Sequence, residues 1–513
     1  MPPRLDQKAP RASPVFRLKV AAGLLTGLHG HDFAAARSYL EIKWPGQPRP
    51  LQILRFMGWG FRQTFIEIPD ALTTVTSAKA VSTTSIWLAA TNPLANHPWA
   101  KDPEATLPQQ VDVVVIGAGF TGAACAYHWS KRKGGTMAVL EMNEASSGSS
   151  GRNEGTIVMG RFYAYARHTV LKHLDKFRAD LTPEQSGRLA SQFAAAYVKA
   201  AYKNADMIQQ TIKDEGFDVD YARNGWVQGR SVQAQEALDE SVRLGREAGF
   251  DDWVKIPPKQ VLELTGMSLD HSAGFSQRAG SWHPAKWVWS LLGRALEDER
   301  ISFFSNTRVT DVLTEGDLYE VRTTRGSIRA KYIINATESY TALLHPQFIG
   351  RLHPTQTQGG YVEGGPDSMK RDISIQSTEG WFGKHHDGVI FGSDATRISY
   401  RGAGRIKPSH FITKYMIAEV QRRFGRSRMN LTREWSCTAG FTDDEFPIVG
   451  VMDGRRQYII AGMCGSGSGV HFNAARHVVD QVLGIPGPDD YPREYFSPTR
   501  VLDPRGHKWP EIV

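Results

Sequence analysis

The sequence predicts an α/β fold with two parts, one built on a parallel sheet and one of antiparallel strands packed with helices. A continuous β-branched run at 113–116 is typical of a parallel strand buried on both faces. A glycine turn and helix-compatible sequence (121–133) follow, and "TMAVLE" (136–141) indicates a second strand. A β-meander over 311–337 is expected to end in another buried strand.

The second part is expected to combine amphipathic helices with a hairpin-rich sheet. Helical periodicity covers much of 166–250, and "PAKWVWSLLGRALEDE" (284–299) predicts a further helix. The segment "DGVIFGSDATR" reads as one arm of a hairpin, with the Asp387-Gly388 pair supplying the positive-φ turn.

Composition narrows the function classes. The 513 residues are 41% hydrophobic and 22% charged, as in ordinary globular proteins, and the length suggests two to four domain-sized units. The net charge is +8, but Lys and Arg are scattered, so we expect no nucleic-acid partner. Three cysteines give no disulfide framework, and no apolar run is long enough for a transmembrane helix.

The N-terminus is basic. Residues 1–40 carry six Lys and Arg against two Asp, followed from residue 20 by the apolar piece "VAAGLLTGL" (20–28). Such a segment indicates weak targeting, or a basic amphipathic extension that packs on the protein or touches a membrane surface or partner. We expect a cytoplasmic protein; the alternative is organelle targeting, export or membrane association through residues 1–40.

A G-x-G-x-x-G turn links the first strand to the helix. Gly117 permits the tight turn, Gly119 lets a pyrophosphate approach the backbone, and Gly122 allows close helix–strand packing. Phe120 and Thr121 open the helix, whose N-terminal N–H groups favour phosphate. Glu141, at the end of the second strand, is placed to accept bonds from ribose hydroxyls. The motif predicts a dinucleotide other than NADP and does not separate NAD from FAD.

A Ser/Gly-rich loop after the second strand extends this site. "SSGSSGRNEG" (146–155) contains Ser149, Ser150, Arg152 and Asn153, which could wrap a pyrophosphate. Together with the glycine turn it resembles the D-amino-acid oxidase superfamily of FAD-dependent oxidoreductases, in the branch of glycine oxidase, sarcosine oxidase and the γ-glutamylputrescine oxidoreductases. Glu154 replaces the small residue that is usual in that family's loop.

The resemblance runs from about residue 85 to 490. "AGSWHPAKWVWSLLGRAL" (279–296) resembles the family's helix entry, and "RAKYIINATESYT" (329–341) resembles its second FAD-contacting strand, with Glu338 where glycine is usual. The resemblance implies FAD as the cofactor, and Val309, Ala336 and Thr337 among the residues that bind it.

The resemblance also implies a domain organisation with a Rossmann-like FAD-binding domain that is discontinuous in sequence. We expect this domain to comprise 85–165, 279–342 and 431–490, and an antiparallel-sheet-plus-helices substrate domain to comprise 166–278 and 343–430. Residues 1–84 form an N-terminal extension of unknown role, and 491–513 form a C-terminal tail.

A second glycine loop, "GMCGSGSGV" (462–470), leads into a C-terminal helix and resembles the family loop that packs over the flavin. Backbone N–H groups at a helix N-terminus favour the negative charge of a reduced flavin, so Gly465, Ser466 and Gly467 are candidate contacts. Cys464 is expected to be a packing residue. No lysine follows this loop, which argues against a sarcosine-like substrate.

Cys437 lies in "EWSCTAGFTDDEFPIVG" (434–450), which resembles the family's C-terminal FAD segment. In sarcosine-oxidase and fructosyl-amino-acid-oxidase relatives a cysteine in such a segment is bonded to the flavin. In γ-glutamylputrescine-like relatives a glycine stands there. Two roles for Cys437 stay open: a covalent anchor, or a small residue packed against the flavin.

We expect an FAD-dependent amine or amino-acid oxidase or dehydrogenase. A small-molecule amine would pass a hydride from its α-carbon to flavin N5, and the imine would then be hydrolysed. The alternatives are a flavin-bearing subunit of a larger complex and a hydroxyl-oxidising flavoenzyme.

The catalytic residues stay unassigned, and the weak candidates are Lys384, Arg161 and Tyr163. Ile390 stands where sarcosine-oxidase relatives carry the oxygen-activating lysine. The identity of the electron acceptor therefore stays open between oxygen and a redox partner. The histidine clusters at 29–32 and 384–388 lack convincing ligand spacing, and we expect no metal.

Overall fold

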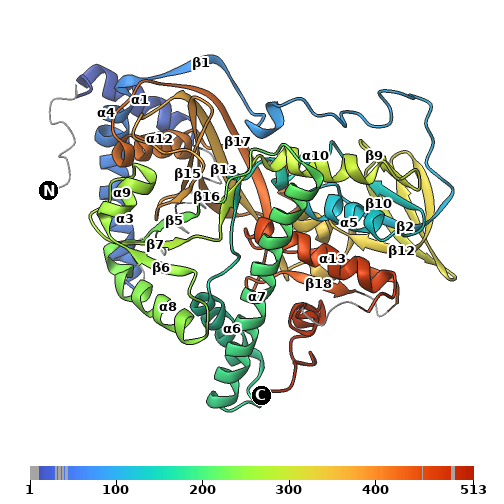
Figure 1. The fold of residues 1–513 in the computed structure, drawn as a ribbon. Helices are drawn as coiled ribbons and strands as arrows, with labels where there is room; N and C mark the ends of the chain where they lie inside the picture. The colour runs from blue at the N-terminus through green and yellow to red at the C-terminus, as the bar shows by residue number, and fades with distance from the viewer. Residues whose placement is uncertain are drawn as a thin grey trace.

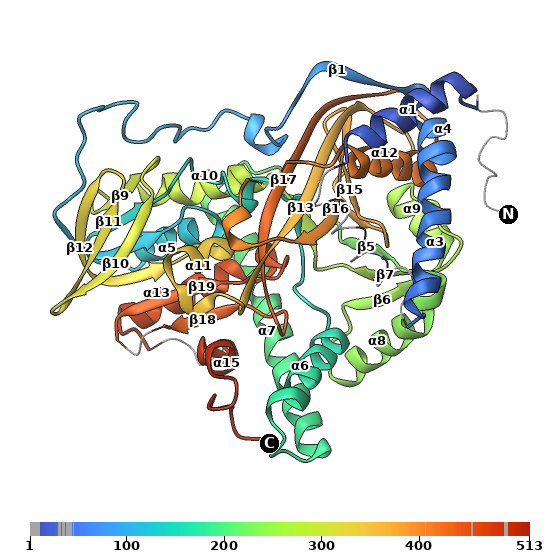
Figure 2. The same cartoon turned by 180° about the vertical axis from the view of Figure 1, so that it is seen from behind.

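The structure is a computed structural model, and it describes residues 11–28, 32, 36, 40, 44, 46–405, 407–452, 455–486 and 491–512, without the side chains of 233 and 394–397. Two large sheets lie side by side, and helices cover their faces (Figures 1 and 2).

The first sheet has eight strands and a parallel centre. Its parallel strands are β9 (Ile301–Phe304), β3 (Met137–Leu140), β2 (Gln110–Ile116), β12 (Gly326–Asn335) and β19 (Gln457–Ala461). Val113, Val114 and Val115 of β2 are fully buried, because the sheet is covered on both faces. The β-branched run therefore does form the central buried strand.

Antiparallel strands extend this sheet. β10 (Val309–Glu315) and β11 (Leu318–Thr323) form the expected meander with β12, and β18 (Ile448–Val451) pairs with β19. A small two-stranded ladder joins β4 (Thr156–Ile157) to β8 (Gly280–Ser281).

Three helices pack together over one face of the first sheet. They are α5 (Phe120–Lys131), α10 (Pro284–Ala295) and α13 (His471–Val482). Val113 and Val115 lie with Ala124, Val288 and Val478 in one hydrophobic core. The helix expected to reach residue 299 ends at Ala295, because turns close the segment before β9.

The second sheet has nine strands, of which most neighbours are antiparallel. In order they are β1 (Val75–Ser82), β17 (Met429–Thr442), β13 (Leu352–Gly364), β16 (Gly388–Arg397), β15 (Trp381–His385), β14 (Ser374–Gln376), β5 (Trp226–Gly229), β7 (Ala273–Ser276) and β6 (Trp253–Ile256). Within the described part of this sheet, only β1–β17 and β14–β5 are parallel pairs.

The hairpin between β15 and β16 corrects one detail of the prediction. His385 pairs with Gly388, so the two-residue turn is His386-Asp387 rather than Asp387-Gly388. The positive φ, 49°, falls on His386. A side chain at Gly388 would meet the ring of Tyr361 and the carbonyl of Val362, so the glycine serves packing.

Helices surround the second sheet. α12 (His410–Phe424) and α9 (Pro258–Thr265) contribute to its core, while α6 (Tyr163–Phe177) and α8 (Gln235–Glu247) lie below it in Figure 1. α7 (Pro183–Glu215) runs beside α13 and packs against it. The 33-residue α7 begins with a capping box, in which Thr182 and Gln185 satisfy each other's backbone N–H groups.

The N-terminal extension packs against the second sheet. α1 (Pro14–Thr26), α3 (Arg49–Arg62), a π-helical turn (Gln63–Glu67) and α4 (Ile68–Ala71) lie beside α12 (Figure 2). β1 then pairs with β17, with Val75 opposite Met429. At the other end of the chain, α14 (Arg493–Phe496) and α15 (Thr499–Leu502) fold back onto the first sheet.

Candidate active site

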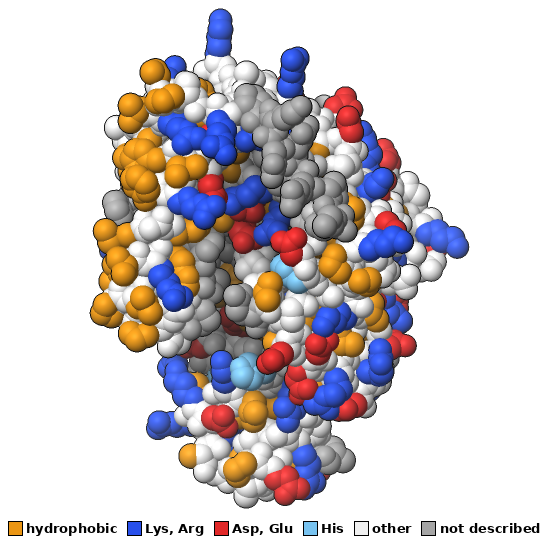
Figure 3. Space-filling view, turned by 90° about the vertical axis from the view of Figure 1, so that its left-hand side faces the viewer, with side chains coloured by type: hydrophobic (Ala, Val, Ile, Leu, Met, Phe, Trp, Pro, Cys, Tyr) orange, Lys and Arg blue, Asp and Glu red, His pale blue; other side chains and the backbone are white. Residues whose placement is uncertain are grey.

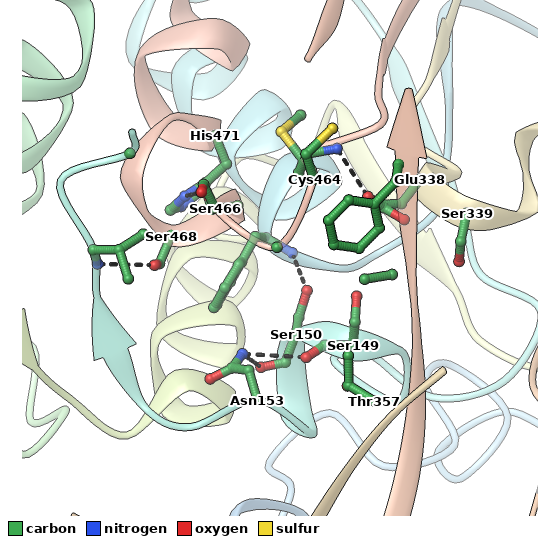
Figure 4. Close-up of a pocket in the computed structure, with 18 of the residues that line it drawn as sticks. Ser149, Ser150, Asn153, Glu338, Ser339, Thr357, Cys464, Ser466, Ser468 and His471 are labelled. Atoms are coloured by element: carbon green, nitrogen blue, oxygen red, sulfur yellow. Dashed lines mark hydrogen bonds between the residues drawn. The ribbon is translucent and has the colours of Figure 1, made fainter. Parts of the chain in front are cut away.

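A cavity of about 940 Å³ runs from the carboxyl end of β2 toward the second sheet. Its wall combines the start of α5, the loops after β3 and β12, strand β17 and the loop before α13. Figure 4 shows side chains from these elements arranged around one common space. Ligands of open α/β sheets bind at this end of the strands.

The glycine turn is tightly constrained. Gly117 has a φ of 107°, and a Cβ there would lie 2.5 Å from the carbonyl oxygen of Ala336. A Cβ on Gly122 would lie 1.8 Å from the carbonyl oxygen of Gly117, so α5 can approach the turn this closely only with glycine. The turn therefore has the form that a pyrophosphate cradle requires.

The serine-rich loop is fixed against the start of α5. The hydroxyl of Ser150 accepts a hydrogen bond of 2.8 Å from the backbone N–H of Phe120. The Asn153 amide donates to the carbonyls of Ser149 and Ser150 (Figure 4). These bonds hold the loop over the N-terminus of α5, where partial positive charge favours phosphate.

Glu141 closes the same end of the cavity. Its carboxylate accepts 2.9 Å bonds from the backbone N–H groups of Ala118 and Asn143, one on each oxygen. Burial raises the pKa of the carboxyl, while these two N–H groups oppose that shift. Each oxygen keeps a further lone pair for a ribose hydroxyl.

Glu338 lies in the cavity wall in a left-handed conformation, with a φ of 49°. Its carboxyl accepts bonds of 2.7 Å from the N–H of Gly440 and 2.9 Å from the N–H of Met463. It therefore connects β17 to the second glycine loop. Burial raises the pKa of this carboxyl to about 7.

The second glycine loop turns into α13 beside a buried histidine. Desolvation lowers the pKa of His471 to about 3, so the imidazole is neutral. Its Nδ1 lies 2.9 Å from the carbonyl oxygen of Gly467, and its Nε2 accepts from the indole of Trp287 at 3.1 Å. These partners assign the proton to Nδ1, and the bond fixes the loop over the cavity.

The three cysteines lie in different surroundings. Cys125 and Cys464 are buried, and burial raises the pKa of the Cys464 thiol to about 12. Cys437 is half-buried on β17, opposite Thr357 of β13, and its sulfur contacts the Thr357 hydroxyl. Cys437 and Thr357 both line the cavity.

The part of the cavity formed by the second sheet and by the segment around the start of α6, here called the substrate compartment, is aromatic and basic. Its lining includes Phe162, Tyr165, Trp226, Trp253, Trp381, Gln228, Gln376, Arg161 and Arg230.

These arginines differ in their partners, and a third, Arg167 of α6, also lines the cavity and donates to the Ser191 hydroxyl at 2.9 Å. Arg161 donates to the carbonyl of Cys464 at 3.0 Å and pairs with Glu445 at 3.3 Å. Arg230 donates to the Gln228 side chain at 2.6 Å, and no described carboxylate lies within ion-pair distance of it. Desolvation by the surrounding protein lowers the pKa of Arg230, as expected for an uncompensated cation.

Of the seventeen residues that the sequence suggested for the cofactor, fifteen line the cavity. Gly122 lies behind the turn, and Arg152 is turned away: its Nε donates to the carbonyl of Ser147, and its own carbonyl accepts from Trp435. The fifteen are Gly117, Gly119, Phe120, Thr121, Glu141, Ser149, Ser150, Asn153, Val309, Ala336, Thr337, Cys437, Gly465, Ser466 and Gly467. Cofactor contact by each stays a prediction.

Of the three catalytic candidates, one lines the cavity and two do not. Arg161 lines the cavity, whereas Tyr163 packs on Phe250 outside it. Lys384 lies away from the cavity and donates to the carbonyl of Pro366, while Ile390 is part of the core. The described residues contain no three-ligand metal cluster, and His29 and His31 lie outside them.

Comparison with known proteins agrees with this geometry. The profile of the FAD dependent oxidoreductase family matches residues 112–481. Gamma-glutamylputrescine oxidoreductase from Escherichia coli strain K12 is 25% identical over 278 residues, which are 50% of this chain and 56% of that enzyme. The chain thus matches about half of the length of this relative.

A longer match is to sarcosine oxidase subunit beta from an Arthrobacter species. It is 23% identical over 411 residues, covering 73% of this chain and 87% of that subunit. Among solved structures, L-amino acid deaminase from Proteus vulgaris superposes with a TM-score of 0.60 at 16% identity, over 77% of this chain and 98% of the other. The predicted fold class and the resemblance are confirmed.

Proposed function

This chain belongs to the FAD-dependent oxidoreductase family, and from that premise we propose that it oxidises the C–N bond of an amine or amino acid. One observation carries the proposal: a single cavity joins the glycine turn to the substrate compartment with Arg161 and Arg230. Relatives named for glutamylputrescine and sarcosine support an amine or amino-acid substrate.

The residues present fit FAD. A side chain at Gly117 or Gly119 would collide with the Ala336 carbonyl or the Ser150 hydroxyl, so both positions line the cavity as bare backbone that a pyrophosphate can approach. Glu141 is placed for a ribose. Ser466 and Gly467 would face the flavin end from the loop before α13. FAD, when bound, supplies the acceptor for a hydride from the carbon next to the substrate nitrogen.

We propose that Arg230 holds an anionic group of the substrate. Arg161 is already compensated by Glu445, whereas the one hydrogen-bond acceptor of Arg230 among the described residues is the side-chain amide of Gln228. A charge-assisted bond to a carboxylate would satisfy Arg230. The indoles of Trp226, Trp253 and Trp381 supply apolar walls, which exclude water and favour the unprotonated amine that oxidation requires.

The test compares an amino acid with the matching amine that lacks the carboxylate. Arg230→Met should raise KM for the amino acid by about 10- to 100-fold, because a charge-assisted bond contributes about 1.5–3 kcal/mol. It should leave KM for the amine nearly unchanged, and Arg188→Met, on the exposed face of α7, should alter neither. Equal effects on both substrates, or oxidation of alcohols but of no amine, would contradict the proposal.

We further propose that the electrons taken from the substrate pass to an acceptor other than oxygen. No lysine is among the described residues that line the cavity, and Lys384 is held elsewhere by Pro366. Reduction of an artificial dye should therefore be faster than oxygen consumption with the same substrate. Oxygen consumption at the full turnover rate would refute this assignment.

Both roles for Cys437 require a thiol on the cavity wall, which is where the structure has it. Acid precipitation of the protein distinguishes the two roles. Flavin that stays with the pellet, and is lost in Cys437→Ala, supports a covalent anchor. Flavin released wholly into the supernatant supports a packing contact.

A second candidate function is that of a subunit in a larger flavoenzyme. The match to sarcosine oxidase subunit beta favours it, because it covers 87% of that protein. Isolation of the untagged protein at its native level should then yield a complex with a different polypeptide. A lone chain with full amine-oxidising activity would exclude this role.

A further inference from the structure

Exposed apolar side chains are concentrated at the N-terminal end of the molecule. Nine of the sixteen large hydrophobic residues that are exposed in the described parts of the chain lie between residues 15 and 66. They are Val15, Leu18, Leu25, Leu51, Ile53, Leu54, Met57, Phe61 and Ile66. Figure 3 views the side of the molecule on which α1 and α3 lie in Figure 1, and hydrophobic side chains gather along one edge of this face.

The helix α3 is amphipathic, but it exposes apolar side chains and buries polar ones. Gln52, near its start, and Gln63, which directly follows it, are buried, with their amides bonded to the carbonyl of Trp44 and to Glu67. Leu54 and Phe61 are 66% and 62% exposed. A surface helix with one face on the protein and the other in water shows the opposite pattern, with apolar residues buried and polar residues exposed.

The outward residues of both helices follow one spacing. Leu51, Leu54, Gly58 and Phe61 of α3 recur at i, i+3, i+7 and i+10, as do Val15, Leu18, Ala22 and Leu25 of α1. This spacing places each set on one face of its helix. The opposite face of α1 packs into the protein through Leu24. Each helix is therefore anchored on one side and presents apolar groups on the other.

Basic residues surround this face. Residues 1–70 contain ten Lys and Arg against five Asp and Glu, so they supply five of the chain's eight net positive charges. Arg11, Lys19, Arg55 and Arg62 are exposed. The carboxylates near them are engaged: Asp70 pairs with Arg17, and Glu67 with Arg62 and Arg422.

We propose that α1 and α3 dock this protein on the surface of an anionic lipid bilayer, lying in the plane of the interface. An exposed apolar helix face flanked by cations is the combination that binds such a surface. None of the described helices is long and apolar enough to cross a bilayer. A protein partner would be matched less well, because the cores of protein interfaces are depleted of charged residues, whereas exposed Lys19 and Arg55 directly follow Leu18 and Leu54 in these helices.

The test is co-sedimentation with vesicles, using the full-length protein with its flavin. The protein should sediment with vesicles of mixed phosphatidylglycerol and phosphatidylcholine, and far less with phosphatidylcholine alone or at high salt. The double variant Leu54→Glu/Phe61→Glu should bind more weakly by about tenfold or more for each side chain. The matched double variant Leu313→Glu/Ile485→Glu, at exposed apolar positions on the first-sheet side, should bind as the wild type does.

A charge variant keeps the test valid if the double variant fails to fold. Lys19→Gln/Arg55→Gln should weaken binding to the anionic vesicles by about fivefold for each charge and leave flavin content and turnover unchanged. Three results would overturn the proposal: no sedimentation with anionic vesicles, equal losses in both apolar double variants, or light scattering that shows a dimer which Leu54→Glu/Phe61→Glu dissociates while vesicles bind nothing.

Discussion

The buried carboxyl of Glu338 should make the stability of this protein fall as pH rises, and Glu338→Gln should remove that dependence. The group has a pKa of about 7 in the folded protein against an ordinary value of 4.5. Between these values the folded state keeps a proton that the unfolded chain has released. Its contribution to stability is therefore complete below pH 4.5 and is lost as pH rises through 7.

The size of the effect follows from the shift. Linkage over pH 5 to 8 gives a loss of about 2–3 kcal/mol from this one carboxyl. A chain of 513 residues has an unfolding entropy of roughly 2 cal/mol/K for each residue, so 1 kcal/mol corresponds to about 1 °C in Tm. At every pH the substitution also lowers the free energy of unfolding by about 1–3 kcal/mol, because the amide oxygen of Gln can accept from only one of the N–H groups of Gly440 and Met463.

Thermal unfolding of the wild type and of Glu338→Gln at a series of pH values tests the predicted pH dependence of stability. The Tm of the wild type minus the Tm of Glu338→Gln should fall by about 2–3 °C from pH 5 to pH 8. The exposed-site control Glu299→Gln should show a constant difference. If the Tm of the wild type minus that of Glu338→Gln stays constant, or rises with pH, the assignment of a buried, protonated carboxyl beside the cavity is refuted.

Two further substitutions test the site and its support. Gly122→Ala places a Cβ 1.8 Å from Gly117, so FAD content should fall by tenfold or more, whereas Gly293→Ala, a helical glycine with open space around it, should keep the cofactor; equal FAD content in both would contradict the tight turn. Arg500→Met leaves Asp444 buried without its ion pair and should lower Tm by about 3–5 °C, from about 3–5 kcal/mol, whereas exposed Arg493→Met should not; an unchanged melting curve would show that the pair contributes little.

Short-range features of the site could be predicted from the sequence. The run at 113–116, the glycine turn and the second strand lie within 31 residues, and each is set by local sterics and burial. The predicted helix (121–133) differs from α5 by one residue at its start and two at its end. Fifteen of the suggested residues line the cavity because one continuous strand–turn–helix positions many of them.

The substrate compartment could not be predicted in the same way. Gln228 and Gln376 are brought together by the parallel pairing of β5 with β14, which are almost 150 residues apart in the chain. Nothing in either short strand indicates the other, so the sequence does not single out Arg230. The pairing of β1 with β17 was missed for the same reason, since register between distant strands leaves no local pattern.

Glu338 and His471 were also missed as structural groups. Glu338 was noted only as a departure from a family pattern, because its two backbone partners lie about 100 and 125 residues further along the chain. His471 opens α13, and its Nε2 partner, the indole of Trp287, lies 184 residues away in the chain, so no local pattern indicates its role.

The central claim is that this cavity holds FAD. Mass spectrometry and absorbance of the purified, folded protein test it most directly. The structure predicts close to one FAD for each chain, with a flavin band near about 450 nm that bleaches when the substrate amine is added without oxygen. Folded protein that carries no flavin, and takes up none when FAD is supplied, would contradict the account.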